Sequence, residues 1–137
     1  MGRFIKSAAH IGLYIKDLER SIQFYEEILD FQMIRRFTSL EGNHMAFMKS
    51  GNLIIELIQH VEWMDRKDGL FDHIAMEVDD IETVSRVLQE KGIQMGMDIY
   101  HDKLVTADGV KYQDFRGPDG EHLELYQYVG NTELFKA

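Results

Sequence analysis

Cysteine is absent from this chain of 137 residues, and its absence removes several kinds of chemistry. A chain without thiols forms no disulfide, no thiolate zinc site and no iron–sulfur cluster, and it offers no cysteine nucleophile. If the protein binds a metal, the ligands must be nitrogen and oxygen atoms from side chains such as His, Asp and Glu.

Positive charge is scarce as well. The 15 basic residues are outnumbered by 24 acidic residues, which gives a formal net charge of −9. Such a chain repels nucleic acids and anionic membrane surfaces. The sequence also lacks a long uninterrupted apolar run, and its first residues do not form an apolar leader. We therefore expect a cytoplasmic protein whose partner is a small-molecule substrate, with no nucleic acid and no membrane.

The chain contains one proline and no linker-like segment, so we expect a single domain over residues 1–137. Within it, residues 10–19 align without a gap on residues 73–82, with identical or similarly apolar side chains at most positions. A pattern that occurs twice, nearly half a chain apart, indicates a duplicated structural unit. We place module one at about residues 5–60 and module two at about residues 70–129.

Each module is predicted to contain a strand, a helix and three more strands, because a period of two gives way to a period of 3.6 and then returns. In module one the helix begins after Asp17 and runs to about Leu29. The later strands are expected at residues 32–38, 45–48 and 53–59 in module one, and at residues 93–99, 110–115 and 122–128 in module two. The result is an α+β fold in which tandem βαβββ modules form a cupped, mixed and mostly antiparallel sheet, with the helices on its outer face.

Two histidines and two glutamates occupy matching places in this duplication. Glu56 is the one charged residue in the apolar run from Leu53 to Ile58, and Glu124 stands in the matching strand of module two. His10 and His73 open the first strand of each module. A carboxylate within an apolar strand needs a cation or strong hydrogen-bond donors nearby. The pattern therefore favours four convergent metal ligands.

Each of these residues alone has a structural interpretation. A lone His is often hydrogen-bonded in a partly buried position, Glu56 alone could pair with Lys or Arg, and Glu124 alone could lie on a solvated edge strand. Their repetition favours a divalent ion, and two imidazoles with two carboxylates suit Ni²⁺, Zn²⁺, Co²⁺, Mn²⁺ or Fe²⁺. Such an ion acts as a Lewis acid on substrate oxygens.

Further residues are candidates for the substrate pocket. Trp63 follows the last strand of module one, where an aromatic ring can close over a ligand. Glu77 shares a strand face with His73, and His122 shares one with Glu124.

Three segments carry a resemblance to a known family. They are residues 10–25, which hold a strand and the start of a helix, residues 72–76, and the closing hairpin at residues 115–125. In this order they resemble the vicinal oxygen chelate superfamily, which includes glyoxalase I, bleomycin resistance proteins and dioxygenases. The order His, Glu, His, Glu is similar to that of glyoxalase I, also called lactoylglutathione lyase.

This resemblance implies a tandem βαβββ fold, a homodimer, and a divalent metal that binds two adjacent oxygens of the substrate. It implies a carbon–sulfur lyase that removes a proton from the hemithioacetal of methylglyoxal and a thiol, through an enediolate. Glu124 takes the role of the base, and Glu56 that of its counterpart. In glyoxalase I dimers each site combines two ligands from each subunit, which would pair His10 and Glu56 of one chain with His73 and Glu124 of the other.

The chain departs from glutathione-using members at two positions, since Tyr14 and His60 stand where those members have Arg and Asn. We therefore assign both to the substrate pocket without naming the thiol. Asp30 also replaces a usual Gly. Other functions of the superfamily stay open: a metal-free protein that sequesters a ligand, an epimerase, a thiol transferase or an extradiol dioxygenase.

Overall fold

The computed structural model describes residues 8–63, 65, 68–69 and 71–130. The chain divides into two compact units, Met1–Asp65 and Arg66–Ala137, and each is described by itself. Module one lies in the first unit and module two in the second. The expected module starts at residues 5 and 70 lie outside the described residues. That both modules form one domain stays a prediction.

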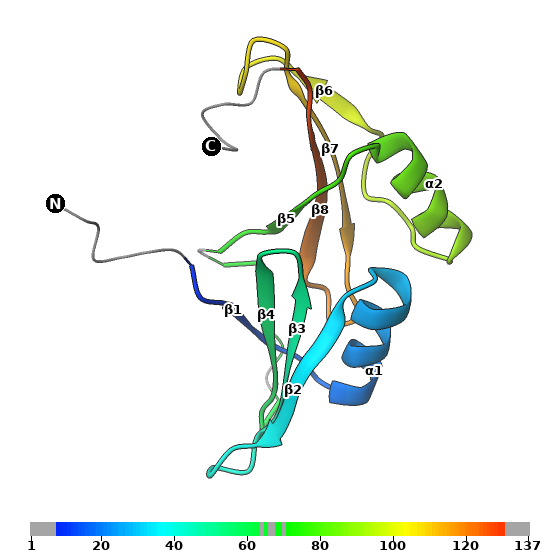
Figure 1. The fold of residues 1–137 in the computed structure, drawn as a ribbon. Coiled ribbons are helices and arrows are strands. Elements are labelled where there is room, and N and C mark those ends of the chain that lie inside the picture. The colour runs from blue at the N-terminus through cyan, green and yellow to red at the C-terminus, as the bar shows by residue number, and fades with distance from the viewer. Residues whose placement is uncertain (1–7, 64, 66–67, 70, 131–137) are drawn as a thin grey trace, which may run out of the picture. The chain divides into compact units, whose positions relative to one another are not determined.

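Module one has the expected order of elements (Figure 1). They are strand β1 (Ile11–Tyr14), helix α1 (Leu18–Gln23), a π-helical turn η1 (Phe24–Ile28), and strands β2 (Gln32–Thr38), β3 (His44–Ser50) and β4 (Leu53–Gln59). The strand order in the sheet is β1-β4-β3-β2. The β1–β4 pair is parallel and the other two pairs are antiparallel.

Module two repeats this arrangement. Its elements are strand β5 (Ile74–Glu77), helix α2 (Ile81–Glu90), and strands β6 (Tyr100–Asp102), β7 (Val110–Arg116) and β8 (His122–Tyr128). The sheet order is β5-β8-β7-β6, again with one parallel pair, β5–β8, at its edge. The predicted α+β fold of two βαβββ modules is confirmed.

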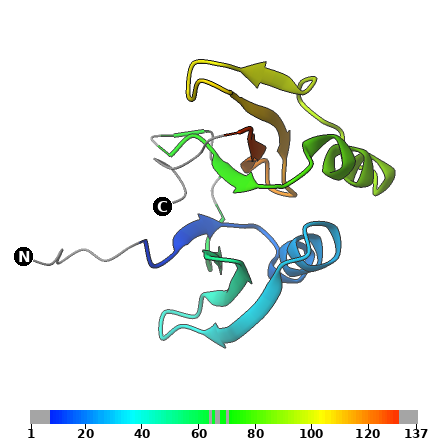
Figure 2. The ribbon, with the colours of Figure 1, turned by 45° about the horizontal axis from the view of Figure 1, so that its top comes forward.

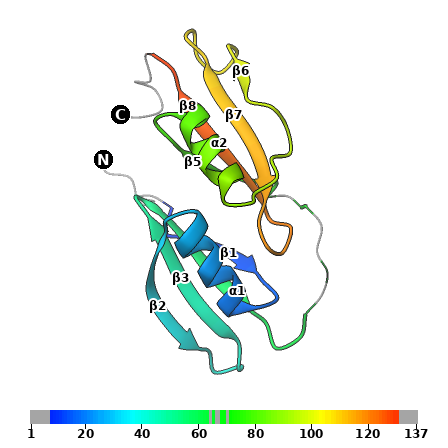
Figure 3. The same cartoon turned by 90° about the vertical axis from the view of Figure 1, so that its right-hand side faces the viewer.

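Each helix covers one face of the sheet in its own module (Figures 2 and 3). Alternation along the strands decides which side chains meet the helix. In module one the buried strand residues are Ala46, Met48, Ile55 and Leu57, and in module two they include Phe115, Leu123 and Leu125 on the corresponding face. The residues between them, Glu56 and Glu124 included, belong to the opposite sheet face. That face carries the candidate ligands.

Both helices start in the same way. Asp17 accepts a hydrogen bond from the backbone N–H of Arg20, and Asp80 accepts one from Thr83. The first helical N–H of each module, on Leu18 or Ile81, donates to the side chain of a glutamine at the end of the last strand, Gln59 or Gln127. These bonds satisfy N–H groups that a helix leaves without partners and fix each helix to its sheet.

The helices end differently. In module one the helix widens into the π-helical turn and is followed by Asp30, which has a φ of 61°. In module two the helix is followed by Gly92, with a φ of 91°. The left-handed region suits glycine, and Asp enters it at some cost. Asp30 therefore makes, with a side chain, the turn that a glycine makes in module two.

The prediction of a strand at residues 93–99 is wrong. The segment makes one isolated bridge, between Met95 and Phe115, and the corresponding strand is β6 at Tyr100–Asp102. The segment is bonded in another way, because Gln113 donates from its side chain to the Met97 carbonyl. Apart from the bridge at Met95, residues 93–99 form no ladder with β7. None of the helices in the described ranges is long and apolar enough to span a bilayer.

Candidate metal centre

His10 and Glu56 form the first half-site. His10 immediately precedes β1, and Glu56 lies in the middle of β4, opposite Gly12 in the parallel register. His10 Nε2 lies 3.9 Å from Glu56 Oε2, and 16% of the Glu56 side chain is exposed. Gly12 has no side chain to lie against this carboxylate. A methyl group there would be in van der Waals contact with Oε1, at 3.9 Å. The imidazole packs edge-on against Phe47.

His73 and Glu124 form the second half-site, with the same geometry. His73 immediately precedes β5, and Glu124 lies in β8 opposite Ala75. His73 Nε2 lies 3.8 Å from Glu124 Oε2, and 12% of the Glu124 side chain is exposed. The matching strand registers of the two modules thus produce two matching His–Glu pairs.

The spacing in both half-sites suits metal ligation. A separation of 3.8–3.9 Å exceeds a hydrogen bond. Ligand atoms that each lie about 2.0–2.2 Å from one ion are separated by about 3 to 4 Å. Neutral imidazole and carboxylate are also donors that bind first-row divalent ions. Within each half-site the residues therefore fit the metal that the sequence predicts. That all four residues meet on one ion stays a prediction.

The surroundings of Glu124 shift its pKa. Burial raises its pKa above the usual value for Glu, and the nearby charges of His73 and His122 oppose this rise in part. Burial disfavours the charged form of a carboxyl group, so an adjacent cation stabilises that form strongly. A carboxylate with a raised pKa is also a stronger base.

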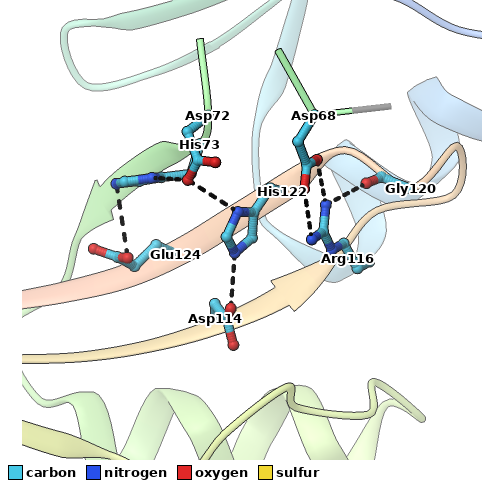
Figure 4. A network of polar contacts seen from close by, with 8 residues as sticks. All are labelled: Asp68, Asp72, His73, Asp114, Arg116, Gly120, His122 and Glu124. Atoms are coloured by element: carbon cyan, nitrogen blue, oxygen red, sulfur yellow. Dashed lines mark hydrogen bonds and ion pairs between the residues drawn. The ribbon is translucent and has the colours of Figure 1, made fainter. Parts of the chain in front are cut away.

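A polar network surrounds His73 (Figure 4). Asp72 Oδ2 lies 2.9 Å from His73 Nδ1 and 3.5 Å from His122 Nδ1. His122 Nε2 lies 2.7 Å from Asp114 Oδ2. The hydrogen bond from His73, together with the charges of both histidines, lowers the pKa of Asp72. Asp72, His73 and His122 also form a group whose ligand atoms lie within 4.8 Å of one another.

A second ion pair connects the segment before Asp72 to the closing hairpin (Figure 4). The two guanidinium Nη atoms of Arg116 bind the two carboxylate oxygens of Asp68 at 2.6 and 2.9 Å. Arg116 also donates to the Gly120 carbonyl at 3.1 Å. This bidentate geometry orients the pair more strictly than a single contact would.

The five predicted pocket residues are spread over both modules. In module one, Tyr14 packs edge-on against His60, with ring centres 6.0 Å apart, and Trp63 donates to Asp65. In module two, His122 lies beside His73, with ring centres 5.6 Å apart, and Glu77 is exposed at the end of β5. The structure thus places Tyr14 beside His60. It also places His122 beside the second half-site. Their contact with a substrate stays a prediction.

A row of tyrosines lies next to Glu124 and was not predicted from the sequence. Tyr126 is two residues beyond Glu124 on β8, so both lie on the same sheet face. It stacks on Tyr112 at 6.4 Å, and its neighbours in the row are Tyr100 and Tyr128. Burial raises the pKa of both Tyr112 and Tyr126. Strand alternation from Glu124 could have identified Tyr126 and Tyr128, whereas Tyr100 required the position of β6.

A family model described as Glyoxalase/Bleomycin resistance protein/Dioxygenase superfamily matches residues 7–125. The chain belongs to this superfamily. The resemblance inferred from the sequence motifs is therefore confirmed.

Individual members of the superfamily are similar along most of their length. A probable lactoylglutathione lyase from Synechocystis sp. is 31% identical over 126 residues, which cover 86% of this chain and 92% of that protein. Glutathione transferase FosA from Serratia marcescens is 25% identical over 126 residues, covering 89% and 81%. The crystal structure of a glyoxalase family protein from Enterococcus faecalis superposes with a TM-score of 0.78 at 27% identity, covering 90% of this chain and 99% of that one.

Proposed function

We propose that this chain is a metal-dependent enzyme of the glyoxalase I type, which isomerises a small α-oxo compound bearing two adjacent oxygens. The observation that carries the proposal is the repeated His–Glu geometry, at 3.9 Å in one module and 3.8 Å in the other. The similarity to a probable lactoylglutathione lyase supports the same reaction. His10, Glu56, His73 and Glu124 are the proposed ligands of the divalent ion.

The proposed reaction moves one proton between neighbouring carbons. The bound ion supplies a positive charge that stabilises negative charge on the two substrate oxygens. Glu124 accepts the proton from the carbon that bears sulfur in a hemithioacetal. The proton returns to the adjacent carbon, so that the former carbonyl becomes an alcohol and the carbon next to sulfur becomes the carbonyl. No external oxidant or reductant is needed.

Glu124 suits the role of the base because it is the more buried carboxylate and its pKa is raised. The ideal base has a pKa close to the working pH, and burial moves a carboxyl group in that direction. Glu56 is proposed to take the counterpart role. Tyr14, His60, Trp63, Glu77 and His122 are proposed to contact the substrate.

The direct test is turnover by metal-loaded protein. Protein stripped with a chelator and reloaded with Ni²⁺, Co²⁺ or Zn²⁺ should isomerise hemithioacetals formed from methylglyoxal and one of several thiols. Glu90→Gln, an exposed residue at the end of α2, is the matched control for Glu56→Gln and Glu124→Gln. If none of these metals supports turnover with any of the thiols, the reaction assignment fails. If the protein then binds apolar ligands without metal, a sequestering function replaces it.

The proposal includes a homodimer in which His10 and Glu56 of one chain act with His73 and Glu124 of the other. It is tested by mixing two inactive variants, His10→Ala and Glu124→Gln, after reversible dissociation. If sites are shared, half of the dimers are mixed and one of their two sites is intact, which restores about a quarter of the sites. If each site lies within one chain, the mixture stays inactive.

A further inference from the structure

The two half-sites differ in what contacts the second ring nitrogen of the histidine. His10 packs edge-on against Phe47, at a centroid distance of 5.3 Å, and no residue in the described ranges forms a hydrogen bond with its ring. His73, in contrast, has the Asp72 carboxylate 2.9 Å from Nδ1. Among the residues that the structure describes, a hydrogen bond therefore holds the histidine of the second module and none holds that of the first.

This bond decides which nitrogen of His73 is available as a ligand. An ionised carboxylate only accepts hydrogen bonds, so the hydrogen between the two groups must be on Nδ1. In a neutral ring with hydrogen on Nδ1, the lone pair is on Nε2. Nε2 is the atom that faces Glu124 Oε2, at 3.8 Å. The Asp72 contact thus points the lone pair of His73 towards the second half-site.

Asp72 also lies beside the ring of His122, without a hydrogen bond between the two (Figure 4). His122 Nδ1 lies 3.5 Å from the same Asp72 oxygen, and the His122 ring is held by Asp114 at 2.7 Å. Asp114 in turn lies against Gly96, where a Cβ would come within 2.5 Å of Oδ1. The carboxylate beside His73 therefore belongs to a network anchored on β7 and β8.

We infer that Asp72 is a positioning residue: it fixes His73 in the Nδ1–H form, presents Nε2 to the metal, and makes the second half-site the tighter of the two. This inference rests on the proposed function, because it concerns the same metal. A carboxylate behind a ligating imidazole fixes its orientation and increases its basicity. The His73–Glu124 pair then binds the ion first, and His10 and Glu56 complete its coordination.

The first experiment measures the affinity of the full-length protein for Co²⁺, by competition with a chromogenic chelator. Asp72→Ala should weaken binding by about 10- to 100-fold, which is the usual effect of losing such a partner. Asp72→Asn should weaken it less, because the amide oxygen still accepts from Nδ1. Thermal unfolding of both variants without metal checks that they fold.

Asp68→Asn is the matched control. Asp68 is a carboxylate in the same segment, but it pairs with Arg116 and has no contact with His73. If Asp72 only secured the segment, then Asp68→Asn would weaken Co²⁺ binding to a similar extent. The inference requires that Asp68→Asn change the affinity by less than about threefold, well below the effect expected for Asp72→Ala.

The second experiment reads the tautomer directly, by ¹⁵N NMR of the histidine rings in the metal-free protein. His73 should show a protonated Nδ1 and an unprotonated Nε2, and Asp72→Ala should convert it to a mixture of tautomers. Since no metal is present, this result tests the inference even if the proposed metal enzyme fails. A wild-type protein that binds no metal would contradict the proposed function and the metal-binding part of the inference, whereas the tautomer assigned to His73 would still be decided by the spectrum.

Three results would overturn the inference. In one, Asp72→Ala leaves both the Co²⁺ affinity and the His73 tautomer unchanged. In another, Asp68→Asn weakens binding as much as Asp72→Ala does. In the third, His122→Ala abolishes binding whereas Glu124→Gln does not, which would place the ion on Asp72, His73 and His122 and make Asp72 a ligand.

Discussion

The two modules share a backbone pattern and differ in the side chains behind their histidines. In both, a parallel edge strand places His two positions before the small residue that faces the glutamate, Gly12 or Ala75. At three further matching positions, module one has apolar residues where module two has a polar network. The pairs are Ala9 and Asp72, Ile54 and His122, and Phe47 and Asp114. Strand register thus preserves the ligand pair, whereas neighbouring side chains set how firmly it is held.

The largest expected effect is a loss of kcat, and it should differ between the two glutamates. Glu124→Gln should lower kcat of the metal-loaded enzyme by at least about 100-fold, the usual contribution of a general base. Glu56→Gln should lower it less, because Glu56 is not the residue that removes the proton. Initial rates at equal metal occupancy measure both. Equal losses would show that the modules do not divide the roles as proposed.

Shortening a buried leucine should lower the free energy of unfolding to a similar extent in both modules. Leu57 on β4 and Leu125 on β8 are both almost fully buried beneath their helices. Leu57→Ala and Leu125→Ala should each lower the free energy of unfolding by about 2–5 kcal/mol, through lost apolar burial and the cavity left behind. Urea denaturation measures this. A loss below about 1 kcal/mol in one variant would show that this module repacks more easily.

Glu124 should make the metal-free protein sensitive to pH. Its pKa in the folded state is raised from the ordinary 4.5, so the folded protein holds this proton more tightly than the unfolded chain does. Its contribution to stability is complete below pH 4.5 and is lost as the pH rises through the raised pKa. Glu124→Gln should therefore raise the thermal midpoint of the chelated protein at pH 7.

The difference between Glu124→Gln and wild type should disappear below pH 4.5, where the carboxyl group is protonated in both the folded and unfolded states. Differential scanning calorimetry at pH 4 and pH 7 measures this change. A Gln variant that is less stable than wild type at pH 7 would show that the charges of His73 and His122 outweigh burial.

The smallest expected effect concerns the helix ends. Gly92 and Asp30 both have positive φ, but only Gly92 does so without a side chain. Asp30→Gly should raise the free energy of unfolding by up to about 1 kcal/mol, and Gly92→Ala should lower it by about 1–2 kcal/mol. Chemical denaturation tests both changes. An Asp30→Gly variant that loses stability would indicate that the Asp30 side chain stabilises its turn.

Local patterns were enough to predict most of the fold. Alternation identified β1 and β5, and Asp17 and Asp80 marked the helix starts, because caps and strand faces depend on neighbours in the sequence. Residues 93–99 also alternate, but they make one isolated bridge to β7, and the Met97 carbonyl accepts a hydrogen bond from the Gln113 side chain. Such a contact depends on a residue distant in the chain.

The site was predicted only in part for a similar reason. The duplication identified both His–Glu pairs, because the same register recurs in both modules. It did not identify Asp72, because a network that occurs in one module has no counterpart for comparison. His122 was found from its strand face, but its contact with Asp114 depends on pairing between β7 and β8.

The most direct measurement is a crystal structure of the protein soaked with Co²⁺, with the ion located by its anomalous scattering. The account predicts one ion per site at about 2.0–2.2 Å from Nε2 of His10 and His73 and from carboxylate oxygens of Glu56 and Glu124. An ion bound to Nδ1 of His73 together with Asp72 and His122, or bound by one half-site alone, would contradict it.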